Sequence, residues 1–179
     1  MRVPSGRTFY EKDIQIVRQM AQYGFVRYEE KPFRLRSGID SNVYVFGRED
    51  LTDNVEFESK VGESICNAVW NAMRDMGELR QSCLIGIPTA GTALAQAAAM
   101  ASLGSTCVMC HRVMREVLKG HGAHHTWVNG KPDPDRHCYW LVDNVATNGD
   151  SKMEAVQKIA LDGYPLKAQT SILIFVDRQ

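Results

Sequence analysis

The 179-residue sequence lacks several features that would place it in a special class. No apolar stretch approaches the ~20 residues that a membrane-spanning helix needs, and the first residues contain no apolar segment typical of secretory signals. Basic and acidic residues balance at 21 each, which argues against a nucleic-acid coat or a membrane-surface protein. The five cysteines are an odd number and do not suggest a disulfide framework. We therefore expect a cytoplasmic protein with reduced thiols.

The composition is that of an ordinary folded domain. Apolar residues make up 44% of the chain and charged residues 23%, as is typical of soluble globular proteins. The length is sufficient for one hydrophobic core, and no internal repeat or linker divides the sequence. We predict a single domain over residues 1–179, with an N-terminal helix and hood strands in residues 1–50 and the core in residues 51–179.

Hydrophobic periodicity predicts alternating helices and strands. Helices are predicted over 8–24, 52–76, 92–102 and 150–161, and short strands over 25–28, 33–35, 42–46, 83–86, 106–110, 138–142 and 171–176. Asp53 and Glu56 have the spacing of a capping box at the start of the second helix, and Lys152 and Lys158 are predicted to lie on a solvated face of the last one. Apolar strands separated by helices indicate an α/β fold, with a mostly parallel sheet and helices on both faces.

The segment after the predicted strand at 138–142 carries the strongest chemical signal. That strand ends in Asp143, and a loop over 143–149 containing Thr and Gly leads directly into the helix at 150–161. Ligands bind at the carboxyl ends of parallel strands. The N–H groups and dipole at a helix start suit a phosphate, and a carboxylate suits ribose hydroxyls or Mg²⁺. An ordinary strand–helix turn with a capping residue explains the same spacing about equally well.

This segment resembles the phosphoribosyl pyrophosphate (PRPP) motif of type I phosphoribosyltransferases. Further segments resemble orotate phosphoribosyltransferases in particular, and in the same order along the chain. They are a substrate segment at 33–38 with Ser41, a pyrophosphate-binding turn at 85–91, a mobile catalytic loop at 115–122, and a terminal strand at 175–178.

The resemblance implies a type I phosphoribosyltransferase fold with a small N-terminal hood segment. It also implies an enzyme of pyrimidine nucleotide biosynthesis that transfers the phosphoribosyl group of PRPP to orotate, giving orotidine 5′-monophosphate and pyrophosphate. The cofactor would be Mg²⁺ bound with PRPP, and no protein metal ligand is assigned. The partners would be PRPP, orotate and a second copy of the chain in a homodimer, with no nucleic acid and no membrane.

The same resemblance assigns roles to individual residues. The catalytic candidates are Asp143, which would hold the ribose, and Arg115, Lys119 and His121, which would clamp pyrophosphate. Residues 146–151 would bind the 5′-phosphate, while Thr147 and Arg178 would touch the base. The substrate-binding candidates are Arg36, Tyr44, Val45, Thr89, Ala90, Asn144, Val145, Ala146, Thr147, Asn148, Gly149, Asp150, Ser151 and Arg178.

Three substitutions change the charge that the family's motifs place near phosphate. Asn144 stands where the family has a second acid, Glu116 where it usually has lysine, and Asp150 where it has a small hydroxyl residue. They favour an alternative, a catalytically degenerate protein that binds PRPP or a nucleotide as a regulatory module or serves as a scaffold. A third possibility is a phosphoribosyltransferase for another base, because residues 42–46 depart from the family's usual aromatic pair.

A zinc site was the other chemistry suggested by residue types. Cys107 and Cys110, with His121 and either His124 or His125, supply suitable donors. Within the strand predicted at 106–110, however, side-chain alternation would turn the two cysteines to opposite faces. Core packing of the cysteines is the favoured interpretation.

Overall fold

The computed structural model describes residues 8, 10–34, 38–45, 53–118, 120, 126–146, 149–161 and 170–177. The chain forms two compact units, Met1–Phe57 and Glu58–Gln179. Among the described residues, none of the helices has the length and hydrophobicity that a bilayer crossing requires.

The described part of the first unit contains the helix α1 (Glu11–Gln22) and an antiparallel strand pair, β1 (Val26–Arg34) and β2 (Asp40–Val45). Gly24, with φ of +74°, follows the end of α1. The two short strands predicted at 25–28 and 33–35 are one strand, β1, whose register with β2 shifts between Tyr28 and Phe33. The Phe33 ring packs edge-on against Tyr44, with ring centroids 4.9 Å apart.

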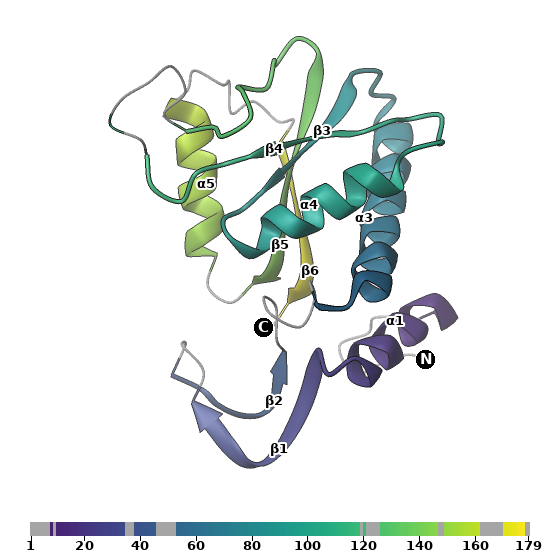
Figure 1. Ribbon diagram of the computed structural model, residues 1–179, viewed down its shortest axis with the longest axis vertical. Helices are drawn as coiled ribbons and strands as arrows, with labels where there is room; N and C mark the ends of the chain where they lie inside the picture. The colour runs from purple at the N-terminus through teal and green to yellow at the C-terminus, as the bar shows by residue number, and fades with distance from the viewer. Residues whose placement is uncertain are drawn as a thin grey trace. The chain divides into compact units, whose positions relative to one another are not determined.

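The second unit is built on a four-stranded parallel sheet, in the order β4-β3-β5-β6 (Figure 1). Its elements are α3 (Val55–Met76, which begins in the first unit), β3 (Gln81–Gly86), α4 (Ala90–Ala101), β4 (Cys110–Val113), β5 (His137–Ala146), α5 (Asp150–Leu161) and β6 (Thr170–Asp177). The predicted α/β class and parallel sheet are therefore confirmed.

Helices cover both faces of this sheet, with α5 on one side and α3 and α4 on the other (Figure 1). On the α5 face, Ile85 and Leu141 belong to a buried cluster that includes Ile159 of α5. A Cβ on Gly62 of α3 would lie 2.7 Å from the backbone of Ala97 in α4, so these two helices pack in close contact. Burial on both faces is the reason that β3 and β5 each contain a continuous apolar run, over 83–85 and 138–142.

Two predictions of local structure are wrong. The strand expected at 106–110 begins only at Cys110, because the segment after α4 is held by a serine: the Ser102 hydroxyl accepts the Met109 N–H at 2.9 Å. Cys107 therefore precedes the strand, and all five cysteines are free thiols. The cap of α3 is also one residue later than expected, since Asn54 Oδ1 accepts the Phe57 N–H at 2.9 Å.

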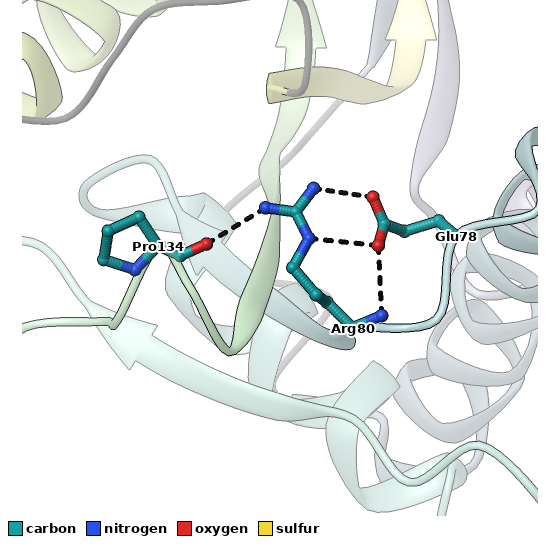
Figure 2. A network of polar contacts seen from close by, with 3 residues as sticks. All are labelled: Glu78, Arg80 and Pro134. Carbon is teal, nitrogen blue, oxygen red and sulfur yellow. Dashed lines mark hydrogen bonds and ion pairs between the residues drawn. The ribbon is translucent and has the colours of Figure 1, made fainter.

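An ion pair between Glu78 and Arg80 lies just before β3, and Arg80 also hydrogen-bonds to the segment before β5 (Figure 2). The Arg80 guanidinium binds both carboxylate oxygens of Glu78, at 2.6 and 3.0 Å, and donates to the Pro134 carbonyl at 3.0 Å. The side-chain and backbone hydrogen bonds from Arg80 lower the pKa of Glu78 to about 2. The network fixes the amino-terminal end of the sheet, opposite the end where ligands are expected.

We predict that Glu78→Gln lowers the free energy of unfolding by about 1 kcal/mol at pH 7, a partly solvated pair being worth no more. Because the pKa of Glu78 is depressed in the folded state, its contribution is complete above the unfolded value of about 4.5 and fades as the pH falls toward 2. Urea denaturation of both proteins at pH 7, 4 and 2.5 measures the difference. If the difference in unfolding free energy between the two proteins did not change with pH, the lowered pKa of Glu78 would be contradicted.

Candidate functional site

The turn after β3 lies directly against the carboxyl end of β5. The Ile87 N–H donates to the Val142 carbonyl at 2.8 Å. A Cβ on Gly91 would overlap that same carbonyl oxygen and would lie 3.4 Å from the Asp143 Cα. Glycine at position 91 thus allows the first turn of α4 to approach the part of β5 that carries Asp143. The predicted pyrophosphate-binding turn and the PRPP-like segment are therefore next to each other.

The first turn of α4 suits an anion. Thr89 is the N-cap residue and is exposed, Ala90 begins the helix, and no acidic residue occupies the first turn. The partial positive charge of the helix start and its N–H groups are therefore not offset by a nearby carboxylate in that turn. The Pro88–Thr89 peptide bond is cis. Thr89 and Ala90 remain candidates for contact with a diphosphate.

β5 is longer than the sequence suggested. Residues 143–146, expected in a loop, continue the strand, and Asp143, Val145 and Ala146 pair with Ile174, Val176 and Asp177 of β6. The prediction of a loop from Asp143 is wrong because β6 extends far enough to pair with this stretch. Asn144 lies in the same extension. The described part of the connection to α5 is Gly149, whose φ of +82° suits glycine.

Asp143 is buried and ion-paired at the base of this connection. Lys152, in the first turn of α5, places its Nζ 2.5 Å from Asp143 Oδ2, and both side chains are only 8% exposed. The ammonium also donates to the Val145 carbonyl at 2.5 Å and to the Ser151 hydroxyl at 3.3 Å. Asp143 Oδ1 accepts the Asn144 N–H at 2.9 Å. The prediction that Lys152 lies on a solvated face is wrong.

We predict that Lys152→Met lowers the free energy of unfolding by about 3–5 kcal/mol, because it leaves a buried carboxylate without its counter-charge. Asp143→Asn/Lys152→Met removes both charges and should recover at least half of that loss. Chemical denaturation of the wild type, both single variants and the double variant forms a double-mutant cycle. Additive effects of the two substitutions would show that the pair is not coupled.

The start of α5 carries the remaining described residues of the PRPP-like segment. The Gly149 carbonyl accepts the N–H groups of Lys152 and Met153, each at 3.0 Å. Asp150 and Ser151 are exposed in the first turn. A carboxylate at this position stabilises the helix through its dipole, and it adds negative charge beside the N–H groups that would face a 5′-phosphate.

Arg115 lies where the chain leaves the sheet after β4. Its N–H donates to the Thr126 carbonyl at 2.7 Å, and the neighbouring residues Met114 and Trp127 form an antiparallel bridge. Trp127 is buried in the core cluster on the α5 face. The start of the segment that resembles a catalytic loop, residues 115–122, is therefore fixed against Thr126 and Trp127. Arg115 Nε is buried with no hydrogen-bond partner among the described residues.

Lys158, the second lysine of α5, binds backbone carbonyls at the start of that segment. Lys158 Nζ donates to the Glu116 carbonyl at 2.6 Å and to the Arg115 carbonyl at 3.4 Å, and it pairs with Glu154 at 2.7 Å. Its side chain is 12% exposed, so the solvated face predicted for Lys158 is also wrong. Both lysines of α5 instead hold backbone carbonyls next to the candidate site.

The structure brings together some of the predicted site residues. Around the ends of β3 and β5 it gathers Thr89, Ala90, Asp143, Asn144, Val145, Ala146, Gly149, Asp150 and Ser151. Tyr44 and Val45 lie in β2 of the first unit. Outside the described residues lie Arg36, Lys119, His121, Thr147, Asn148 and Arg178. No group of three or more His, Cys, Asp or Glu side chains within the described ranges could hold a metal ion.

The four-stranded sheet, with buried Asp143 near the end of β5 and the start of α4 beside it, belongs to a fold that solved phosphoribosyltransferases share. The chain has that fold, and of the three solved structures described below the two orotate enzymes give higher TM-scores than the adenine enzyme. No family model matches the sequence.

Three solved structures illustrate the similarity. Orotate phosphoribosyltransferase of Francisella tularensis is 15% identical with a TM-score of 0.64, over 89% of this chain and 69% of that one. The Mycobacterium tuberculosis orotate phosphoribosyltransferase in complex with Fe(III) dicitrate is 16% identical with a TM-score of 0.62, over 92% and 83%. Adenine phosphoribosyltransferase of Leishmania tarentolae is 13% identical with a TM-score of 0.51, over 92% and 74%.

Proposed function

We propose that this chain is a phosphoribosyltransferase that transfers the phosphoribosyl group of PRPP to orotate, giving orotidine 5′-monophosphate and pyrophosphate. One observation carries the proposal: Asp143, near the end of β5, lies beside the first turn of α4 and is ion-paired with Lys152 in the first turn of α5. PRPP presents a sugar diol between two phosphate groups, and this arrangement offers a carboxylate next to two anion-binding helix starts. The higher TM-scores of the orotate enzymes support orotate as the base.

The chemistry asks the protein to stabilise a leaving pyrophosphate while the sugar becomes cation-like. Asp143 accepts hydrogen bonds from the ribose hydroxyls, and the first turn of α5 binds the 5′-phosphate. Thr89 and Ala90 receive the diphosphate, whose negative charge Arg115, Lys119 and His121 neutralise as the bond breaks. Mg²⁺ enters bound to the diphosphate, as part of the substrate. Thr147 and Arg178 contact the base, with Arg36 near the substrate, in a homodimer.

Pyrophosphate release tests the reaction directly. The purified chain with PRPP and Mg²⁺ should release pyrophosphate when orotate is added, and not with adenine or other bases. Turnover with a different base would support the transferase activity and identify that base, instead of orotate, as the substrate. PRPP binding without turnover on any base would favour the regulatory alternative, to which Asn144 and Glu116 point.

A further inference from the structure

We propose that Lys152 is a positioning residue of the sugar-phosphate site: its ammonium, in place of a divalent cation, holds the Asp143 carboxylate ready to bind ribose hydroxyls. The inference rests on the proposed function and deepens it. It predicts that the ribose 5-phosphate end of the substrate binds without Mg²⁺.

The ammonium is fully engaged on both sides of the connection between β5 and α5. Its three N–H groups meet the Asp143 carboxylate, the Val145 carbonyl and the Ser151 hydroxyl. Two of these partners belong to the end of β5 and one to the first turn of α5. Lys152 thereby ties the helix start that would bind phosphate to the strand end that would bind the sugar.

The carboxylate is fixed but not saturated. One oxygen of Asp143 accepts the Lys152 ammonium, and the other accepts the Asn144 N–H. A carboxylate offers about four acceptor positions, so within the described part of the chain each oxygen keeps a lone pair for a sugar hydroxyl. An ion-paired carboxylate that cannot rotate presents those lone pairs in one direction, which lowers the ordering cost of binding.

The charge of Asp143 is already balanced without a metal. Lys152 offsets it, and the adjacent side chain of Asn144 is neutral. A divalent cation at Asp143 would have to bind beside a buried ammonium of the same sign, which disfavours it. Removing Lys152 should therefore do two things: release the carboxylate from its fixed orientation and make it available to Mg²⁺.

Ribose 5-phosphate is the probe, because it carries the sugar hydroxyls and the 5′-phosphate but no diphosphate to bring Mg²⁺ with it. Its dissociation constant is measured calorimetrically for the wild type and Lys152→Met, in EDTA and in excess Mg²⁺. The wild type should bind equally in both. Lys152→Met should bind about tenfold more weakly or worse in EDTA and regain affinity in Mg²⁺, which a purely structural role would not produce.

Lys158→Gln is the matched control, since Lys158 is a similarly enclosed lysine of α5 that does not contact Asp143 in the described structure; its affinity for ribose 5-phosphate should equal that of the wild type. If Lys152→Met does not fold, Asp143→Asn/Lys152→Met replaces it and should bind weakly with and without Mg²⁺. Wild-type affinity in Lys152→Met, or Mg²⁺-dependent binding by the wild type, would overturn the inference and leave the proposed function standing. Wild-type affinity in the double variant would overturn both, because that variant lacks the Asp143 carboxylate. If the wild type bound neither ribose 5-phosphate nor PRPP, both this inference and the proposed function would be overturned.

Discussion

Gly91→Ala is expected to lower the free energy of unfolding by about 3 kcal/mol or more, because the added methyl group would collide with backbone rather than with a movable side chain. The Cβ would overlap the Val142 carbonyl oxygen and lie 3.1 Å from its carbon. Relief requires moving α4 away from β5, which also separates Thr89 and Ala90 from Asp143. Any folded fraction should therefore bind PRPP poorly.

Urea denaturation measures the loss, with Gly120→Ala as the control. Within the described part of the chain no atom lies within 4 Å of a Cβ placed on Gly120, and the φ of Gly120 is not in the left-handed region. The stability of Gly120→Ala should therefore stay within about 0.5 kcal/mol of the wild type. An equally small change in stability for Gly91→Ala would mean that the turn after β3 is not packed against β5.

Lys119→Ala is expected to lower turnover by about 10²–10³-fold, as the loss of one group that stabilises transition-state charge commonly does. Lys119 lies outside the described residues, and its role rests on the resemblance of residues 115–122 to a mobile catalytic loop. A mobile loop contributes little to the core, so the melting temperature should hardly change.

Steady-state kinetics and thermal melting of Lys119→Ala and Lys119→Arg separate the two properties. The arginine variant keeps the positive charge and should retain more turnover than the alanine variant. A large fall in melting temperature for Lys119→Ala would place this lysine in the packed structure and refute the catalytic-loop assignment.

The fold was predictable where burial leaves a clear pattern. β3 and β5 are buried on both faces and read as apolar runs, and α5 has the bounds that the sequence predicted. β4 was misplaced because it lies at one end of the strand order, where half-buried His111 and Arg112 interrupt the pattern. The extension of β5 to Ala146 depends on pairing with β6, which is non-local and leaves no mark on the segment itself.

The candidate site was only partly predictable, for a similar reason. The acidic strand end and the small residues after it identify Asp143 and Gly149 as functional candidates from the sequence alone. Lys152 carries no such signal, because a lysine beside Asp150 and Ser151 at the start of a helix looks solvent-exposed. Its burial depends on a carboxylate in the preceding strand that only the folded connection brings within 2.5 Å.

Binding of PRPP tests the central claim most directly. Titration of PRPP with Mg²⁺ into the purified chain, followed by orotate in the same calorimeter cell, separates binding from turnover. The account predicts heat on addition of PRPP and release of pyrophosphate on addition of orotate. No heat on addition of PRPP would contradict it, because the part of β5 that carries Asp143, next to the starts of α4 and α5, would then not be a PRPP site.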